Sequence, residues 1–265
     1  MMTGPGDLPR TFPDACKLVS LSSFPTGLRA AVVGAGGGIG NAVVELLAES
    51  PRVAQVYALT RTRPALVNPR VESIPFDLED EASIAAAASR CKAGGPLHLV
   101  ILATGVLHDG HGLQPEKSWR ALYAGSLAQS FAVNTIGPAL VAKHFLDGLA
   151  TGEKAVFAAL SARVGSIEDN RLGGWHSYRA AKAALHMLIR TFAIELARRN
   201  PTALCIALHP GTVDTALSRP FQSGVPEGRL FTPRHAADCL LDVIDRLDAS
   251  ASGNAFSWDG QRLRF

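Results

Sequence analysis

Charged residues and cysteines are scarce in this sequence. Asp, Glu, Lys and Arg make up 18% of its 265 residues, whereas 47% are hydrophobic. This balance excludes an intrinsically disordered chain, which would be rich in charge and poor in apolar side chains. The four cysteines are far apart, with no CxxC pair: Cys16, Cys91, Cys205 and Cys239. Their spacing indicates neither a disulfide framework nor a zinc site, and favours a reducing compartment such as the cytoplasm.

Long apolar runs and runs of basic residues are also absent. The longest apolar run, residues 97–107, is interrupted by His98 and is shorter than the roughly 18 residues that a membrane helix needs. The net charge of +3 is small and is not gathered into a Lys/Arg run. We therefore expect no membrane anchor and no nucleic-acid-binding surface. The length suits one large α/β domain.

Residues 1–27 differ in composition from the rest of the chain. Four prolines stand in this short segment, and proline at this density disfavours both helices and central strands. Charged residues interrupt it, so we expect it to contain no apolar core of a secretory signal. We predict a loosely ordered leader, followed by a single domain over residues 28–265. The alternative is that the leader folds back through Leu18, Val19, Leu21 and Phe24.

From residue 28 onward, short apolar runs alternate with stretches of helical periodicity. The runs predict strands over residues 28–33, 53–59, 71–76, 98–103, 155–160, 203–208 and 255–258. The other stretches predict helices over residues 41–48, 84–93, 126–149, 178–199 and 233–247, the last capped by Thr232 and opened by Pro233. This alternation predicts an α/β fold: a doubly wound parallel sheet (Rossmann-like) with helices on both faces. Ligands bind such a fold at the carboxyl ends of its strands.

A glycine-rich turn follows the first predicted strand and leads into a helix. It reads Gly34-Ala35-Gly36-Gly37-Gly38-Ile39-Gly40. Glycines allow a tight turn and let a pyrophosphate approach the helix N-terminus, where free N–H groups and the helix dipole favour anions. With a strand before it and a helix after it, the turn predicts a dinucleotide site rather than a flexible loop.

The end of the second predicted strand distinguishes NADP from NAD. An NAD site usually has an acidic residue here for the ribose hydroxyls, whereas a nearby arginine accommodates the 2′-phosphate of NADP. This chain has Thr60, followed by Arg61 and Arg63. A guanidinium binds a phosphate through paired hydrogen bonds, so the sequence favours NADP(H). The alternative is that both arginines are solvated loop residues.

Tyr178 and Lys182 are four residues apart, and therefore lie on the same side of a predicted helix. A lysine so placed can lower the pKa of the phenol and hold it where a proton is given or taken. A YxxxK pair alone is common on solvated helix surfaces. The pair indicates a catalytic site here because a glycine turn that predicts dinucleotide binding precedes it in the sequence.

Four motifs in this order resemble the short-chain dehydrogenase/reductase (SDR) family. They are the glycine turn, Asn134, the Tyr178/Lys182 pair and the Pro210-Gly211 step after a strand. The resemblance runs from about residue 28 to the C-terminus. Residues 161–188 (SARVGSIEDNRLGGWHSYRAAKAALHML) resemble the C-factor-like carbonyl reductase branch, and residues 253–260 (GNAFSWDG) are similar to the family's last strand.

The resemblance implies roles for the catalytic residues. Tyr178 would be the general acid that protonates a carbonyl oxygen as hydride arrives from the nicotinamide. Lys182 would bind the nicotinamide ribose and keep the phenol acidic. Asn134 would support a proton-relay water beside the lysine; its structural alternative is a polar mid-helix residue.

The resemblance also implies cofactor contacts. Asp77 would hydrogen-bond the adenine, although it could equally be a turn residue. The nicotinamide would be walled by Pro210, Gly211 and Thr212 and reached by Thr215, for which a helix cap is the alternative. Residues 216–231 would form a lid over the substrate.

Two positions depart from the family pattern. The turn after the fourth strand is usually Asn-Asn-Ala-Gly, but here it is Leu102-Ala103-Thr104-Gly105. The substrate-orienting serine is usually three residues before the glycine that corresponds to Gly165, and that position is Ala162. We predict that Ser161 replaces it, which requires a bend at the strand end because neighbouring strand residues point to opposite faces. Ser166 is the other candidate.

Two further readings of the sequence are weaker. His176 and Ser177 suggest Ser/His hydrolysis, but there is no G-x-S-x-G elbow after a strand. His108 and His111 could bind a metal, yet they lie in a glycine-rich stretch that is better explained as a solvated loop; we predict no metal site.

The sequence therefore predicts an NADP(H)-dependent oxidoreductase that reduces a ketone or aldehyde to an alcohol. We expect a small-molecule carbonyl substrate and a homodimer or homotetramer. The main alternative is a catalytically weak or inactive NADP(H)-binding signalling or scaffold protein, which Ala162 and the altered turn favour. NAD-dependent alcohol oxidation is a third reading, disfavoured by Thr60 and Arg61.

Overall fold

Parallel strands form the centre of the molecule. The structure, a computed structural model, describes residues 20–61, 68–110 and 112–265, and within them eight strands make one sheet in the order β10-β9-β6-β5-β4-β1-β2-β3. Its strands are β1 (Leu28–Val33), β2 (Val53–Thr60), β3 (Val71–Pro75), β4 (Leu99–Leu102), β5 (Ala155–Leu160), β6 (Ala203–His209), β9 (Ala255–Ser257) and β10 (Arg262–Leu263). Neighbours run parallel, except that β10 is antiparallel to β9.

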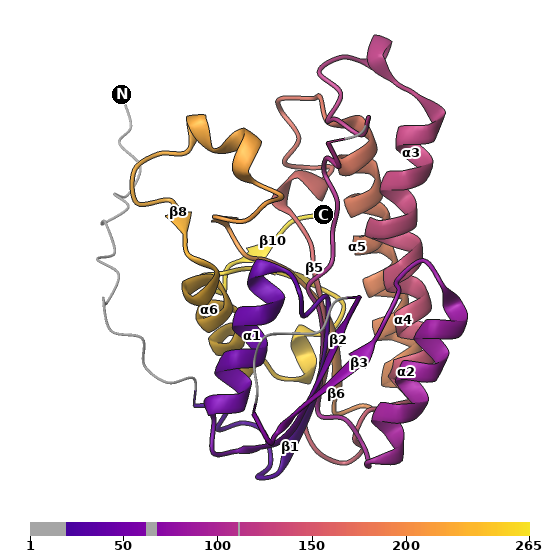
Figure 1. The fold of residues 1–265 in the computed structure, drawn as a ribbon, viewed down its shortest axis with the longest axis vertical. Coiled ribbons are helices and arrows are strands. Elements are labelled where there is room, and N and C mark those ends of the chain that lie inside the picture. Colours follow the sequence, from indigo (N-terminus) through magenta and orange to yellow (C-terminus); the bar gives the residue numbers. More distant parts are fainter. Residues whose placement is uncertain (1–19, 62–67, 111) are drawn as a thin grey trace.

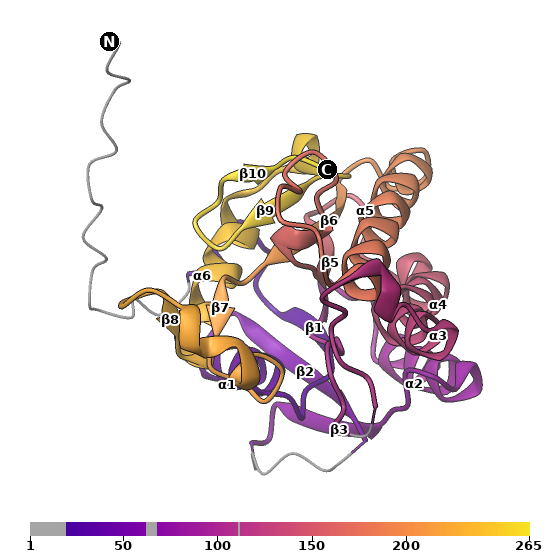
Figure 2. The same ribbon diagram turned by 90° about the horizontal axis from the view of Figure 1, so that it is seen from above.

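Helices cover both faces of this sheet (Figures 1 and 2). One face carries α1 (Gly38–Glu49) and α6 (Pro233–Arg246); the other carries α2 (Glu81–Ala93), α3 (Ala124–Phe131), α4 (Gly137–Phe145) and α5 (His176–Ala197). On each face, a cluster of buried hydrophobic side chains packs the helices against the sheet. The cluster under α1 and α6 includes Leu47 and Ile244, and the cluster on the opposite face includes Phe145 and Leu185. Among the described residues, no helix is both long and apolar enough to cross a membrane. The predicted doubly wound α/β fold is confirmed.

The strand order locates the ligand-binding crevice. The chain builds outward from β1 to β2 and β3, then returns to the other side of β1 for β4, β5 and β6. The connections after β1 and β4 therefore leave the sheet in opposite directions and open a crevice between them. The glycine turn directly follows β1, so it lies at this crevice.

The helix predicted over residues 126–149 is divided in the structure. It comprises α3, a π-helical turn (Ala132–Ile136), α4 and a 3-10 turn (Leu146–Gly148). The π turn contains Asn134, whose side chain donates to the Ser130 carbonyl oxygen at 3.0 Å. Such turns are rare and often mark functional sites. A single π-helical turn hardly alters the spacing of apolar residues, so the sequence pattern does not reveal it.

Three two-residue strands were not predicted, because so short a run shows no periodicity. One is β10, and the others are β7 (Thr212–Val213) and β8 (Leu230–Phe231), which pair in parallel with each other. This pairing joins the two ends of the segment between β6 and α6. The predicted cap of α6 is confirmed, since Thr232 Oγ1 accepts a hydrogen bond from His235 N at 3.2 Å.

Residues 20–27 pack against the domain. Leu21 and Phe24 are 0% and 2% exposed, within the cluster beneath α1 and α6. The Asp245 carboxylate on α6 accepts hydrogen bonds from the backbone N–H groups of Ser22 and Ser23 at 3.0 and 2.9 Å. Residues 1–19 of the predicted leader lie outside the described residues. The part of the leader that the structure describes is thus attached to the core.

Candidate active site

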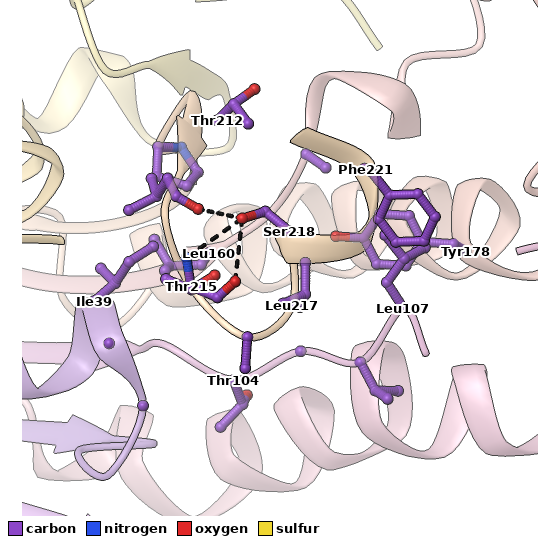
Figure 3. A pocket seen from close by; sticks show the side chains of 18 of the residues that line it. Ile39, Thr104, Leu107, Leu160, Tyr178, Thr212, Thr215, Leu217, Ser218 and Phe221 are labelled. Atoms are coloured by element: carbon purple, nitrogen blue, oxygen red, sulfur yellow. Dashed lines mark hydrogen bonds between the residues drawn. The ribbon is translucent and has the colours of Figure 1, made fainter. Parts of the chain in front are cut away.

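A cavity of about 920 Å³ opens at the carboxyl end of the sheet. Its walls come from the glycine turn, the loop after β4, the end of β5, the first turns of α5 and the segment after β6. Figure 3 shows Ile39 toward one end, and Leu107, Tyr178 and Phe221 together toward the other. We call these the nucleotide end and the reaction end.

The glycine turn forms the nucleotide end. Gly34 has a φ of 83°, and a Cβ there would lie only 2.9 Å from Thr104 Cγ2. A Cβ on Gly38 would lie 2.9 Å from Thr215 Cγ2, so the chain after β6 closes against the start of α1. Gly40 is buried against the Gly34 carbonyl, while Gly36 is exposed in the turn. The packing therefore requires glycine at several of these positions.

The N-terminus of α1 faces this end of the cavity. Gly37, Gly38 and Ile39 line it, and within the described residues the helix start has neither a side-chain cap nor an acidic first turn. Its N–H groups and dipole therefore suit an anion.

Arg61, which the sequence predicts to contact the 2′-phosphate, lines the cavity just beyond β2. Arg63 lies outside the described residues. Thr104 follows Leu102 and Ala103, the two positions where the family usually has asparagines, and its buried Oγ1 has no hydrogen-bond partner among the described residues. A buried hydroxyl without a partner is costly unless a ligand satisfies it.

Tyr178 and Lys182 stand on one face of α5 at the reaction end. Lys182 is 2% exposed, and its Nζ donates to the Leu160 carbonyl oxygen at 2.9 Å and lies 5.7 Å from the centre of the Tyr178 ring. Burial lowers the pKa of Lys182 to about 8 and raises the pKa of Tyr178, so the prediction that Lys182 keeps the pKa of the phenol low is wrong for this structure. At neutral pH the phenol is therefore protonated and can act as an acid.

Asn134 lies behind this pair and is completely buried. Its amide donates to the Val106 carbonyl oxygen at 2.8 Å and accepts from Val106 N at 3.2 Å. A Cβ on Gly105 would lie 3.3 Å from Asn134 Oδ1 and 3.7 Å from Lys182 Nζ. The structure thus brings Asn134 and Lys182 together on either side of Gly105.

Ser161 lines the cavity, whereas Ser166 is not among its described lining residues. Ser161 Oγ lies 2.7 Å from Nε2 of His186 on α5. Ser166 is buried and its Oγ accepts a hydrogen bond from Asp169 N at 3.1 Å. Of the two candidates, only Ser161 is among the described lining residues, and its hydroxyl is already paired with His186.

Sequence comparison agrees with this arrangement. A sequence model of the family described as short chain dehydrogenase matches residues 29–225. This chain belongs to the short-chain dehydrogenase family. It is therefore an oxidoreductase by family, as its sequence predicted.

Two curated relatives and a solved structure illustrate the likeness. C-signal of Myxococcus xanthus is 34% identical over 137 residues, which are 52% of this chain and 77% of that protein. Carbonyl reductase [NADPH] 2 of Sus scrofa is 28% identical over 90% of this chain and 97% of its own. The crystal structure of NADPH-bound carbonyl reductase from chicken fatty liver superposes with a TM-score of 0.77 at 27% identity, covering 91% of this chain and all of that one.

Some predicted residues of this short-chain dehydrogenase line the cavity, whereas others are not among its described lining residues: Gly34, Gly36, Gly40, Asp77 and Asn134. Pro210, Gly211, Thr212 and Thr215 line it. Asp77 is not among the described lining residues; its Oδ1 accepts a hydrogen bond from Glu79 N at 3.0 Å, as a turn residue would.

The segment 216–231 lies over the cavity. Leu217, Ser218, Phe221 and Val225 line it. Ser218 Oγ holds the start of the segment through the carbonyl oxygens of Val213 and Thr215 (Figure 3).

Sequence reasoning missed the anchor of α5. Glu116 is buried, and its carboxylate accepts hydrogen bonds from the hydroxyl and the backbone N–H of Ser177. Burial raises the pKa of Glu116, but these hydrogen bonds outweigh burial and hold it below its usual value. A carboxylate at a helix N-terminus also complements the dipole. No local pattern links residue 116 to residue 177, because the contact is purely tertiary.

Proposed function

We propose that this short-chain dehydrogenase uses NADP(H) to reduce a ketone or aldehyde to an alcohol. The observation that carries the proposal is the position of Tyr178 and Lys182 at one end of a cavity whose other end is the glycine turn and Arg61. The NADPH-bound chicken carbonyl reductase, whose fold this chain shares, supports it.

The residues present fit the cofactor. The open N-terminus of α1, with Gly34, Gly36, Gly38, Ile39 and Gly40 around it, would hold the diphosphate. Arg61 would pair with the 2′-phosphate. The Thr104 hydroxyl, which has no partner among the described residues, would give a polar contact next to Ala103, where the family asparagine is absent. Gly211 and Thr212 would wall the nicotinamide, and Asp77 would contact the adenine from its turn. When bound, the reduced cofactor supplies a hydride to the carbonyl carbon.

Tyr178 supplies the proton of the reaction. Its phenol O–H donates to the carbonyl oxygen and transfers the proton as that oxygen becomes an alcohol. The buried ammonium of Lys182 lies beside the ring and stabilises the phenolate that forms. Asn134 fixes the loop after β4 against α3 and α4, and would hold the water that returns a proton through Lys182.

Ser161 is the second hydrogen-bond donor to the substrate in this proposal. Burial and the charge of Lys182 lower the pKa of His186 to about 4, so its imidazole is neutral and carries one N–H. When that N–H is on Nε2, it donates to Ser161 Oγ. The Ser161 proton is then free for the substrate oxygen.

The test is loss of NADPH absorbance in the presence of a panel of ketones and aldehydes, with NADH measured in parallel and cofactor binding measured by titration. We expect turnover with NADPH and little with NADH. Failure to bind either cofactor would overturn the proposal.

A second function is favoured by the Ser161–His186 pair and by Ala162, which leave the site without a freely available serine hydroxyl. The chain would then be a nucleotide-binding signalling or scaffold protein with weak or no turnover, and its likeness to C-signal is consistent with that. Tight NADPH binding without oxidation of NADPH by any carbonyl compound would establish it.

A further inference from the structure

We propose that the preferred substrate is an uncharged carbonyl compound with an aromatic ring near its carbonyl group. This rests on the proposed function, because it assumes that Tyr178 protonates a carbonyl oxygen. Besides Tyr178, three aromatic side chains that contact one another line the cavity from separate parts of the chain. They are His108 from the loop after β4, Trp175 from the start of α5 and Phe221 from the 3-10 helix η5 (Arg219–Gly224).

These side chains form one continuous wall at the reaction end, which we call the aromatic wall. The centre of the Trp175 ring lies 6.5 Å from that of Tyr178 and 5.2 Å from that of Phe221. The Phe221 ring in turn lies 5.8 Å from His108. All three are half-buried and line the cavity, so none of them is closed off by the rest of the protein. Figure 3 shows Phe221 beside Leu107 at the Tyr178 end.

Trp175 is held in place at a conformational cost. It has φ 51° and ψ 42°, the left-handed region that a bulky residue rarely adopts. Its backbone N–H donates to the Glu116 carbonyl oxygen at 2.6 Å. Such a conformation persists only where the surroundings impose it, and it concentrates at ligand sites. A ring fixed in advance loses little freedom when a substrate packs on it.

The charged groups near the aromatic wall are engaged by the protein. Arg163 Nε binds Asp169 Oδ2 at 2.6 Å, and its side chain is 66% exposed. Asp109 accepts hydrogen bonds from Leu113 N at 3.0 Å and Gln129 Nε2 at 2.9 Å. Lys182 donates to Leu160. A charged substituent on the substrate would therefore lose hydration and would have to compete with the protein's own groups for a partner.

Aromatic pairs prefer tilted or edge-to-face contacts, which add to the effect of apolar burial. A planar ring attached near the carbonyl group can make such contacts with Trp175 and Phe221 while the oxygen reaches Tyr178. A saturated ring of similar size would be buried but would lack them. The aromatic wall thus selects for aromaticity as well as for size.

The test compares phenylacetone with cyclohexylacetone as substrates with NADPH. In both, a methylene separates the ring from the carbonyl group, so the intrinsic reactivity is matched. We expect kcat/KM to be roughly 5- to 10-fold higher for phenylacetone, in keeping with one or two aromatic contacts. A para-carboxylate on phenylacetone should lower kcat/KM far more than a para-methyl group.

Substitutions in the aromatic wall test whether it causes the preference for phenylacetone over cyclohexylacetone. Trp175→Leu and Phe221→Leu should each bring the phenyl-to-cyclohexyl ratio toward one. Phe221 lies on a different segment, so it tests the proposal even where Trp175→Leu disturbs the start of α5. Trp119→Leu is the matched control, since Trp119 is 65% exposed and is not among the described lining residues; its ratio should stay at the wild-type value.

A wild-type ratio near one, or a ratio that neither variant changes, overturns the aromatic assignment and leaves the proposed function intact. Absence of turnover with every carbonyl compound overturns the proposed function instead. In that case, calorimetric titration of the two ketones into NADPH-loaded protein decides the inference. Tighter binding of phenylacetone supports it, and equal or undetectable binding of both overturns it.

Discussion

At the scale of single residues, reactivity at this site depends on burial. Tyr178 and Lys182 are both removed from water, and this raises the pKa of the phenol and lowers that of the ammonium to about 8. Tyr178→Phe keeps the ring and its packing but removes the proton. We expect kcat to fall by about 10²- to 10⁴-fold, the usual contribution of a general acid. NADPH affinity, measured by titration, should stay near the wild-type value. Turnover retained by the variant would show that Tyr178 is not the general acid.

A second prediction at this scale separates the two serines. Only Ser161 lines the cavity, so Ser161→Ala should lower kcat/KM by at least about 10-fold through loss of a hydrogen bond to the developing oxyanion. Ser166→Ala removes a hydroxyl that serves the local turn and should leave kcat/KM within about 2-fold of wild type, although it can lower stability. Steady-state kinetics of both variants are the measurement. A larger loss for Ser166→Ala would contradict the assignment.

At the scale of elements, the end of β2 is predicted to determine cofactor choice. Arg61 lines the cavity immediately after this strand. Arg61→Ala should weaken NADPH binding by about 10-fold or more, since charge-assisted hydrogen bonds to a phosphate are strong. NADH binding should change little because NADH lacks the 2′-phosphate. Equal weakening of both, measured by titration, would exclude a phosphate contact.

The segment before β1 gives a stability prediction at the same scale. Leu21 is completely buried under α1 and α6. Leu21→Ala should lower the free energy of unfolding by about 2–5 kcal/mol, as for other buried leucines. Leu172→Ala is the matched control, because Leu172 is 92% exposed and its loss should cost almost nothing. Urea denaturation of both variants tests this, and similar midpoints would show that the segment does not contribute to the core.

At the scale of the whole molecule, two histidines, the buried His186 and the half-buried His209, make stability depend on pH. Burial lowers the pKa of His186 and of His209 from 6.5 to about 4. Below pH 6.5 the unfolded chain binds protons that the folded protein excludes, so stability is full above 6.5 and falls toward pH 4. The loss at pH 5 should be about 2 kcal/mol for each histidine.

Urea denaturation at pH 7 and pH 5 measures this dependence. His186→Asn removes one titrating group, so the difference in unfolding free energy between the two pH values should shrink by roughly half of the histidine contribution. An unchanged difference would show that His186 is accessible to protons in the folded protein.

Much of the molecule was predictable from local signals. Apolar runs located the seven longer strands, and a helix of period 3.6 could be read even where its middle is a π turn. The glycine turn, Arg61 and the Tyr178/Lys182 pair were visible because each is a short motif whose spacing the backbone alone fixes. The two-residue strands β7, β8 and β10 carry too little periodicity to be seen.

The sequence alone therefore determined the fold class, the glycine turn and the spacing of the reactive pair, since all three follow from local backbone geometry. Tertiary structure decided which groups meet across long separations. It paired Ser161 with His186 and Glu116 with Ser177, and it placed Trp175 beside Phe221. Such contacts depend on how helices and loops pack on the sheet, and packing leaves no periodic trace along the chain.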